Sequence, residues 1–301
     1  MNDTVNKFRT LLESRNVLVS DGAMGTNLQT LGLPPGRPGE DWLSENPDAI
    51  RGLHQRFVEA GSDIILTCSF GGNGLTNAAH SDREVLRINT LAATLARSVA
   101  DEADREVLVG GSMGPTGKLM EPFGPLTEEA VSAAYERQAA ALQDGGVDLL
   151  VLETFYDLGE AVAAVKGVRR ASSLPLVCSF SYDSGLRTMM GVAPEKMAEA
   201  IVPLGVDAIG ANCGTTVANM AQIVMALVGL NTGVPIWAKP NAGVPSGSPP
   251  VYDTTPEQMG DTARRLVEIG AQIVGGCCGN SPEHVRAIAR AATSAEKLED
   301  A

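Results

Sequence analysis

The residues of this sequence best suited to chemistry are three cysteines. Cys213 stands in the segment ANCG, and Cys277 and Cys278 are adjacent in GGCCG. Each segment follows a short apolar run that is typical of a buried strand. Adjacent cysteines form a disulfide only with backbone strain, whereas three thiolates suit Zn²⁺. We therefore expect a zinc ion on Cys213, Cys277 and Cys278, with its fourth position open for substrate; the alternative is three buried, apolar cysteines.

This ligand set also indicates a kind of reaction. A free thiol has a pKa of about 8.5 and is mostly protonated at neutral pH. On Zn²⁺ a thiol loses its proton and is held as a thiolate nucleophile. Three thiolate ligands make the metal electron-rich, which is unfavourable for activating water. The pattern therefore favours alkylation of a substrate sulfur over hydrolysis.

Two carboxylates form the second candidate cluster. Asp21 and Glu153 each end an apolar run. Together they would bind an ammonium group, bind a second metal, or act as acid and base. An amino-acid thiol presents an ammonium group, and backbone N–H groups near Asp21, Gly22 and Thr67 would hold its carboxylate. For Asp21 the alternative is a helix N-cap.

The remaining cysteines and the histidines are expected to play no part in chemistry. Cys178 lies inside a predicted strand and is interpreted as a core residue, and Cys68, at a strand end, is interpreted as structural. His54 and His284 fall within predicted helices, and His80 falls in a polar loop. All three histidines are predicted to be surface residues.

A repeated pattern predicts the elements that position these residues. A helical stretch ends at a glycine and a nearly continuous apolar run follows, as in EAGSDIILT, DGGVDLLVLE, LGVDAIGAN and IGAQIVGGC. Continuous apolar runs are typical of parallel strands buried on both faces. The predicted strands are Val17–Ser20, Asp63–Thr67, Val107–Gly111, Asp148–Glu153, Pro175–Phe180, Asp207–Asn212, Pro235–Lys239 and Gln272–Gly276.

Helical segments separate these strands. They are Ile50–Ala60, Glu84–Ala103, Thr127–Asp144, Leu158–Ala171, Pro194–Pro203, Val217–Val228, Thr255–Ile269 and Ser281–Ala292. The alternation predicts an α/β fold, a single (β/α)8 TIM barrel, with an open doubly wound sheet as the alternative. We expect residues 1–301 to form one domain, with an N-terminal helix at 1–16 and a frayed tail at 294–301. In such a barrel the active site lies at the carboxyl ends of the strands, next to the loops 32–39 and 243–250.

Composition excludes several classes of partner. The 301 residues carry a formal net charge of −13, which disfavours nucleic acid and anionic membrane surfaces. We find neither a signal-peptide pattern nor about 18 consecutive apolar residues. The expected location is therefore cytoplasmic, where thiols stay reduced. A homo-oligomer is left open by the sequence.

Six segments resemble the homocysteine S-methyltransferase family, which includes betaine–homocysteine methyltransferases and the homocysteine-binding domain of cobalamin-dependent methionine synthase. They are DGAMGTNL, GSDIILTCSF, GPTG, ETF, ANCG and GGCCGNSPEH, spread between Val17 and Ala292. The resemblance implies a zinc-bearing barrel that methylates homocysteine. Cys213, Cys277 and Cys278 match the zinc ligands, and Asp21, Gly22, Thr67 and Glu153 match residues that contact homocysteine.

The resemblance leaves the methyl donor open. Relatives use betaine, S-methylmethionine or a methyl-corrinoid. Betaine enzymes of animal type carry tyrosines where this sequence has Gly71 and Thr154, although some bacterial relatives share the SFGG stretch. An aromatic cage for a quaternary ammonium would have to use other residues here: Trp42, Phe70, Phe155 and Tyr156.

Three functions follow as hypotheses. The first is zinc-dependent methyl transfer to homocysteine from a small onium donor, either betaine or a sulfonium such as S-methylmethionine. The second is a homocysteine-activating subunit that takes the methyl group from a separate methyl-corrinoid protein. The third is a zinc- or thiol-binding protein without turnover, which three cysteines facing an open position disfavour, because closed sites use four protein ligands.

Overall fold

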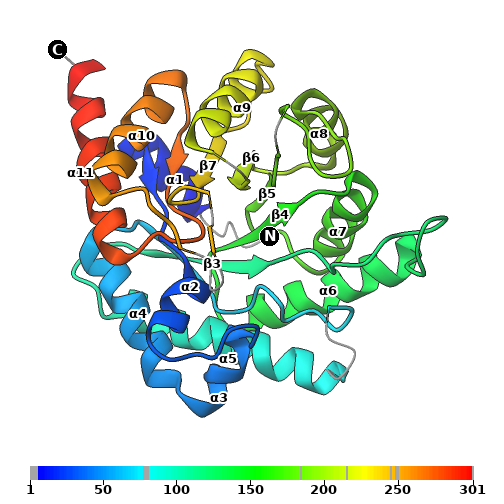
Figure 1. The fold of residues 1–301 in the computed structure, drawn as a ribbon. Coiled ribbons are helices and arrows are strands. Elements are labelled where there is room, and N and C mark those ends of the chain that lie inside the picture. Colours follow the sequence, from blue (N-terminus) through cyan, green and yellow to red (C-terminus); the bar gives the residue numbers. More distant parts are fainter. Residues whose placement is uncertain are drawn as a thin grey trace.

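The computed structural model describes residues 6–299 apart from 77–80, 184, 215, 245 and 248–250, with side chains as far as residue 294. Eight parallel strands form one sheet in the order β1-β8-β7-β6-β5-β4-β3-β2. Backbone hydrogen bonds from Asp63 N–H to Val19 O and from Asp21 N–H to Ile64 O join β1 to β2. The sheet therefore forms a barrel (Figure 1), which confirms the predicted TIM barrel and shows that the open doubly wound sheet is wrong.

The observed strands coincide with the predicted ones. They are β1 (Leu18–Val19), β2 (Ile64–Leu66), β3 (Leu108–Met113), β4 (Leu149–Phe155), β5 (Leu176–Phe180), β6 (Ala208–Cys213), β7 (Ile236–Pro240) and β8 (Ile273–Val274). β3 and β4 run past the predicted ends Gly111 and Glu153. A register shift interrupts β4 between Leu152 and Phe155, as in a β-bulge, which turns the end of the strand.

Helices surround the barrel. They are α1 (Lys7–Arg15), α2 (Met24–Thr30), α3 (Trp42–Glu45), α4 (Pro47–Ala60), α5 (Asp82–Asp101), α6 (Glu128–Asp144), α7 (Leu158–Ala171), α8 (Pro194–Ile201), α9 (Val217–Gly229), α10 (Pro256–Ile269) and α11 (Pro282–Glu299). Two 3₁₀ turns, Gly39–Asp41 and Val202–Leu204, complete the set. The single-domain organisation of residues 1–301 and the frayed tail at 294–301 stay predictions.

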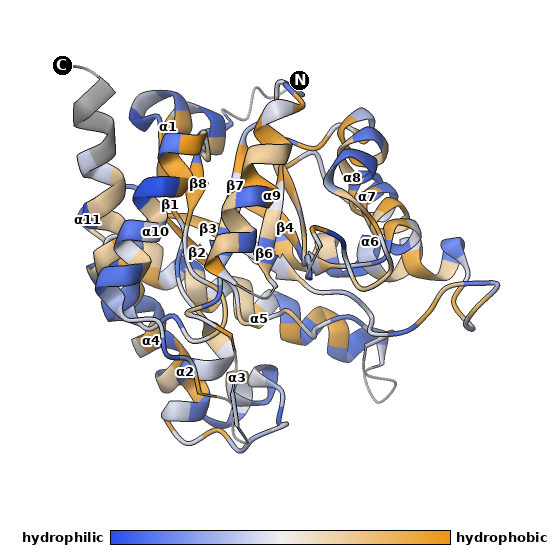
Figure 2. Ribbon diagram, turned by 45° about the horizontal axis from the view of Figure 1, so that its top comes forward, coloured by the Kyte–Doolittle hydropathy of each residue, from blue (hydrophilic) through white to orange (hydrophobic). Residues whose placement is uncertain are grey.

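Two apolar layers hold the barrel together. The larger lies between the strands and the helices, where the apolar faces of the helices meet the sheet (Figure 2). The smaller fills the barrel interior and includes Leu18, Leu149 and Trp237 together with Phe8 and Leu11 of α1. α1 therefore closes the amino-terminal end of the barrel with apolar side chains, and the carboxyl-terminal end remains for a site.

A ring of polar side chains ties the amino-terminal ends of the strands together. The residue before each even-numbered strand accepts a backbone N–H from the preceding strand at 2.8 to 3.2 Å: Asp63 from Val19, Asp148 from Val109, Asp207 from Leu176 and Gln272 from Ile236. Arginines pair with the three aspartates: Arg15 and Arg105 with Asp63, Arg97 with Asp148, and Arg169 with Asp207. The four sequence repeats therefore supply both the apolar strands and this ring.

Candidate active site

A cavity of about 460 Å³ opens at the carboxyl ends of the strands. All seven residues that the sequence predicted for the site line it: Asp21, Gly22, Thr67, Glu153, Cys213, Cys277 and Cys278. Pro38 and Gly39 line it as well, so the predicted loop 32–39 reaches the site. Part of the other predicted loop, 243–250, falls on residues outside those described.

The three cysteines converge on one point. Their sulfur atoms all lie within 4.8 Å of one another, and all three side chains are partly exposed. Cys213 ends β6 with a φ of 59°, a left-handed conformation that non-glycine residues rarely adopt. Gly279, at φ 80°, turns the chain after Cys278, where a Cβ atom would come within 2.3 Å of the Tyr252 ring. The turn that presents both adjacent sulfurs therefore requires a glycine.

The donor set fits a metal ion. The hydrogen bond with Cys213, together with burial, raises the pKa of the Cys277 thiol well above its ordinary value. Three crowded thiols thus resist ionisation by themselves, whereas a bound cation favours their thiolate forms. Aspartate, glutamate, histidine and cysteine side chains can all bind a metal. Among the described residues, these three cysteines form the one group of such side chains that lie close enough together to do so. The geometry agrees with the predicted ligand set.

Asn212 connects the thiols to the end of β4. Its amide nitrogen lies 3.7 Å from Cys277 Sγ and 2.7 Å from Thr154 Oγ1, and its Oδ1 accepts the Thr154 N–H at 2.8 Å. The Ser179 hydroxyl donates to the same Oδ1 at 2.7 Å. Thr154 has a φ of 66°. Asn212 therefore holds a strained turn of β4 beside the metal site, a role that the sequence did not reveal.

Asp21 is buried beneath the cavity. It is 1% exposed, its Oδ2 accepts the Leu66 N–H at 2.7 Å, and its Oδ1 accepts from Lys239 Nζ at 2.9 Å. α2 begins after Ala23 without a side-chain cap. The alternative that Asp21 caps this helix is therefore wrong, and Asp21 lines the cavity instead.

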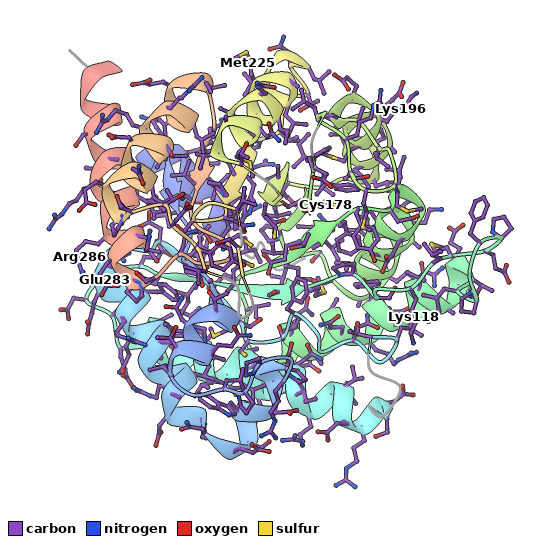
Figure 3. All side chains as sticks on the ribbon, in the orientation of Figure 1. Lys118, Cys178, Lys196, Met225, Glu283 and Arg286 are labelled. Carbon is purple, nitrogen blue, oxygen red and sulfur yellow. The ribbon has the colours of Figure 1, made fainter. Side chains whose placement is uncertain are left out.

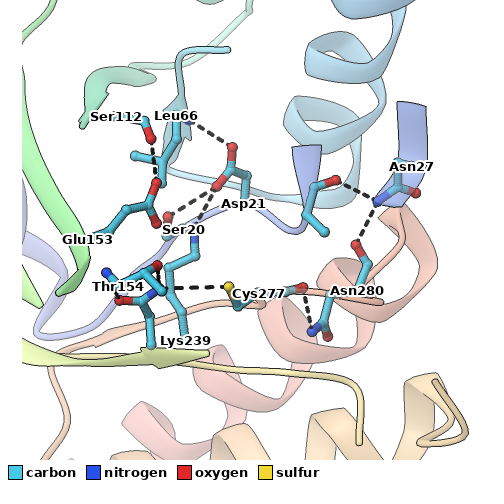
Figure 4. Close-up of polar contacts among 12 residues, drawn as sticks. Ser20, Asp21, Asn27, Leu66, Ser112, Glu153, Thr154, Lys239, Cys277 and Asn280 are labelled. Carbon is cyan, nitrogen blue, oxygen red and sulfur yellow. Dashed lines mark hydrogen bonds and ion pairs between the residues drawn. The ribbon is translucent and has the colours of Figure 1, made fainter. Parts of the chain in front are cut away.

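Glu153 lies across the cavity floor from Asp21 (Figure 4). The Ser112 hydroxyl donates to Glu153 Oε1. Burial raises the pKa of Glu153, while the charge of Lys239 and the hydrogen bond from Ser112 oppose this effect. The anionic form of Glu153 is therefore under-compensated, and a cationic group brought into the cavity would stabilise it.

Lys239 is a charged residue of the site that the sequence analysis did not assign. It lies in β7 and is 2% exposed. Burial lowers its pKa, but the charges of Asp21 and Glu153 outweigh burial and leave the pKa above the ordinary value, so the side chain is a cation. Its Nζ lies 5.7 Å from the centre of the Trp237 ring. The sequence contained one signal that could have identified this residue: a lysine at the end of an apolar run.

Gly22 and Thr67 support the floor of the cavity. A Cβ atom on Gly22 would lie 2.5 Å from the carbonyl oxygen of Asn280, so the close approach of these segments excludes a side chain. Thr67 N–H donates to Gly110 O at 2.9 Å, and Thr67 Oγ1 lies 2.6 Å from Ser69 Oγ. The Thr67 N–H is therefore occupied, and contacts of either residue with substrate stay predictions.

The aromatic residues suggested for a donor pocket separate into two groups. Phe70 is 42% exposed and lines the cavity. Phe155 is fully buried, with its ring between those of Tyr135 and Phe180 at centroid distances of 5.8 and 6.4 Å. Trp42 is likewise part of the buried core. The expectation that Phe155 and Trp42 face a donor is wrong, because both serve the core.

The other cysteines and histidines gave mixed outcomes. Cys178 is fully buried in β5, away from the charged periphery (Figure 3), and Cys68 is 4% exposed at the cavity wall. The prediction for His54 is wrong: it is fully buried, and desolvation lowers its pKa to about 4. His284 is partly buried and lies 2.9 Å from the Thr254 carbonyl oxygen. His80 lies outside the described residues.

No helix in the described part of the chain combines the length and apolar character needed to cross a bilayer. The cytoplasmic location stays a prediction.

The fold and the site together define a class: TIM-barrel proteins with a three-cysteine metal site at the mouth of the barrel. Comparison with known proteins makes the class specific. The family model "Homocysteine S-methyltransferase" matches residues 18–292. The chain belongs to the homocysteine S-methyltransferase family, as the sequence motifs indicated.

Individual relatives agree with this assignment. The chain is 35% identical over 302 residues to a methionine synthase of Mycobacterium leprae and 34% identical over 305 residues to that of Mycobacterium tuberculosis. These matches cover 93% and 95% of the chain but 25% of each relative, so the chain spans about a quarter of their length. The metallated form of the homocysteine methyltransferase MmuM from Escherichia coli superimposes with a TM-score of 0.80 at 25% identity, covering 94% of this chain and 99% of that one.

Proposed function

We propose that this protein transfers a methyl group from a small onium donor, betaine or a sulfonium such as S-methylmethionine, to the sulfur of homocysteine, and that it uses zinc to do so. One observation carries the proposal: three thiols within 4.8 Å of one another stand beside two buried carboxylates in one cavity. The thiols suit zinc and a substrate sulfur. The carboxylates suit the ammonium group of an amino acid.

Each side chain has a defined task in this reaction. Zinc, when held by Cys213, Cys277 and Cys278, supplies an open position at which a thiol gives up its proton and keeps a nucleophilic lone pair. Glu153 receives the substrate ammonium, which compensates its buried charge. Asn212 holds the β4 turn next to Cys277, and this fixes the position of the end of β4 relative to the thiols.

The bond changes balance without a further reagent. The sulfur lone pair forms the S–CH₃ bond while the C–N bond of betaine, or the C–S bond of a sulfonium, breaks. The bonding electrons leave with the neutral amine or sulfide, and the proton of the substrate thiol is released to solvent. Positioning of the two reactants in one cavity supplies a large part of the acceleration, and Phe70 at the rim offers an aromatic face to the onium group.

The relatives support two versions of this reaction. MmuM is named a homocysteine methyltransferase and is matched over 99% of its length, which supports a barrel that acts alone. The methionine synthases are more similar in sequence, and this chain corresponds to a quarter of their length. That similarity favours, as the second candidate, a subunit that takes the methyl group from a separate methyl-corrinoid protein.

A donor panel separates these candidates. Zinc-loaded protein is given homocysteine with betaine, dimethylsulfoniopropionate, S-methylmethionine or methylcobalamin, and methionine is measured. We expect methionine from an onium donor without a second protein. Product from methylcobalamin alone would favour the corrinoid candidate. Zinc and homocysteine binding without product from any donor would likewise favour the corrinoid candidate, whose methyl donor is a second protein. A fourth protein ligand that stays on the zinc in the presence of homocysteine would favour a zinc- or thiol-binding protein without turnover.

A further inference from the structure

Each thiol of the cysteine triad has a hydrogen-bond partner of its own. The pairs are Asn212 with Cys277, Tyr252 with Cys278 and Asn241 with Cys213. The three partners come from β6, from the residue after β7 and from the segment before α10. Amide N–H and phenol O–H groups donate hydrogen bonds, and a thiolate sulfur accepts them. Each cysteine thiolate on a metal would therefore carry one such bond.

These three partners have no donor left for another sulfur. A side-chain amide has two N–H bonds and a phenol has one O–H bond. Asn212 gives its second N–H to Thr154 Oγ1 at 2.7 Å, and Asn241 gives its second N–H to the Gly214 carbonyl oxygen at 3.0 Å. Tyr252 has no second donor. A substrate sulfur that joins the cysteines therefore receives no hydrogen bond from these residues.

The backbone holds Tyr252 next to Cys278. A Cβ atom on Gly279 would lie 2.3 Å from the Tyr252 ring, so the ring packs directly against the turn that follows Cys278. The Thr254 N–H donates to Ala242 O at 3.1 Å, and the Ala242 N–H donates to Cys278 O at 2.9 Å. The segment that carries Tyr252 is thus fixed to the same turn as the thiol.

Methyl transfer at such a site requires a choice between sulfur atoms. Any of the thiolates can attack an onium methyl group: its lone pair forms the S–CH₃ bond, the C–N or C–S bond of the donor breaks, and the bonding electrons leave with the neutral amine or sulfide. A methylated cysteine is a neutral thioether and no longer a thiolate ligand. A hydrogen bond to a thiolate stabilises its charge and lowers its nucleophilicity, because nucleophilicity falls with basicity.

We propose that Tyr252, together with Asn212 and Asn241, protects the cysteines from methylation and so directs the methyl group to the substrate sulfur. This inference rests on the proposed function, because protection matters only where a methyl donor meets the thiolates. Tyr252 is the specificity-determining residue that tests it best. Its hydroxyl can be removed while the ring stays against Gly279, whereas the two asparagines also hold the backbone.

The test measures which cysteine is methylated when no thiol substrate is present. Zinc-loaded protein is treated with methyl iodide, which needs no donor pocket, and peptide mass spectrometry quantifies methylation at each cysteine over time. The variant is Tyr252→Phe. The matched control is Tyr182→Phe, because Tyr182 is buried and its hydroxyl has no hydrogen-bond partner in the described part of the chain.

We expect Tyr252→Phe to raise the rate of methylation at Cys278 by about 3- to 10-fold and to change the rate at Cys277 by less than about twofold. One hydrogen bond to a charged group changes an equilibrium by about 10- to 100-fold, and nucleophilicity follows about half of this change on a logarithmic scale. Tyr182→Phe should leave both rates unchanged. Cys178 is fully buried, so molecules in which it stays unmodified are the folded ones.

A second readout does not depend on methylation. In the cobalt(II)-substituted protein, Tyr252→Phe should move the sulfur-to-cobalt absorption band to longer wavelength, because the Cys278 lone pair is less stabilised without its hydrogen bond. A band that stays in place would show that the hydroxyl does not act on the sulfur.

An unchanged ratio of Cys278 to Cys277 methylation in Tyr252→Phe would overturn the inference. An equal rise at all three cysteines would also overturn it, because the hydroxyl would then only hold the segment closed over the site. Failure of the proposed function gives a different result: the donor panel would yield no methionine, while the methylation ratio, measured without a donor pocket, would stay as expected.

Discussion

The two ends of the barrel use carboxylates in opposite ways. At the amino-terminal end, Asp63, Asp148 and Asp207 each bind a backbone N–H and pair with arginines that are partly exposed. At the carboxyl-terminal end, Asp21 and Glu153 are buried around one lysine. The first arrangement offsets burial with backbone hydrogen bonds and arginine pairs, although burial still raises the pKa of Asp63. The second keeps an excess of negative charge that a ligand can compensate.

Left-handed backbone occurs at both ends but in different residue types: at the amino-terminal end it is found in Asn16 and Asn231, and asparagine tolerates this conformation. Thr154 and Cys213 have φ values of 66° and 59° at the carboxyl ends of β4 and β6. The amino-terminal ring is built on regular strand starts with ordinary hydrogen bonds. Strained residues persist where the surroundings hold them, and they concentrate at functional sites. One end of this barrel is therefore built for stability and the other for binding.

The largest expected effect comes from removing a thiol at the binding end. Cys277→Ala should release the zinc ion and lower the rate of methionine formation by at least about a thousandfold, because several kcal/mol of transition-state stabilisation depend on the metal. The matched control is Cys178→Ala, which removes a buried thiol of β5 outside the cysteine triad. Metal analysis and the methionine assay measure both. Full zinc occupancy in Cys277→Ala would contradict the ligand assignment.

At the stabilising end, Asp148→Ala should cost stability without affecting binding. It removes one of the two ion-pair partners of Arg97 and leaves the Val109 N–H unpaired, a loss of about 1–3 kcal/mol in the free energy of unfolding. Urea denaturation measures this loss. Titration of the cobalt(II)-substituted protein with homocysteine, followed by the sulfur-to-cobalt absorption band, should give an unchanged affinity.

The control for Asp148→Ala is Lys7→Gln, which breaks the contact of an exposed lysine with the same aspartate. An exposed pair contributes about 0–1 kcal/mol, so this variant should unfold nearly as the wild type does. A tenfold loss of homocysteine affinity in Asp148→Ala would show that the two ends of the barrel are coupled.

The sequence predicted these two ends unequally. Nearly continuous apolar runs predicted the strands, and the strands placed Asp21, Glu153 and the three cysteines at one end, as observed. Side chains whose partners are distant in sequence were missed. Lys239 reaches Asp21, which follows β1 and lies 218 residues away in the sequence.

Two further misses have local causes. The register shift in β4 that accompanies the turn at Thr154 leaves no mark on an apolar run. His54 lies on the buried face of α4 beside Leu53 and Phe57, where helix periodicity allows an inward position but polarity suggests an outward one. Its burial depends on tertiary packing, which a single sequence does not display.

The pH dependence of stability should show the uncompensated charge at the binding end. Burial raises the folded-state pKa of Glu153 above its ordinary value of 4.5, so the folded protein binds the proton more tightly than the unfolded chain. Its ionisation therefore destabilises the fold as the pH rises from about 4.5 through that raised pKa. Glu153→Gln should be at least as stable as the wild type at pH 7, and this advantage should vanish below pH 4.5.

Thermal unfolding of both proteins across this pH range measures the difference. When cobalt(II) is bound at the cysteines, saturating 3-mercaptopropylamine, a thiol with an ammonium group and no carboxylate, should reduce this difference, since the bound ammonium compensates Glu153. The opposite result is a stability difference, variant minus wild type, that is smaller at pH 7 than at pH 4.5. It would mean that Lys239 already compensates the Glu153 carboxylate in full.

The smallest expected effect concerns the strained turn at Thr154. In an ordinary position, alanine is more stable than glycine by about 0.5–1 kcal/mol. At a φ of 66° the order should reverse, since a Cβ atom in the left-handed region costs about 1–2 kcal/mol and glycine carries no such cost. Thr154→Gly and Thr154→Ala both lose the hydroxyl that accepts from Asn212, and both keep the N–H that donates to it. The difference between their free energies of unfolding therefore measures the backbone contribution alone. An alanine variant more stable than the glycine variant would show that the turn at Thr154 is not strained.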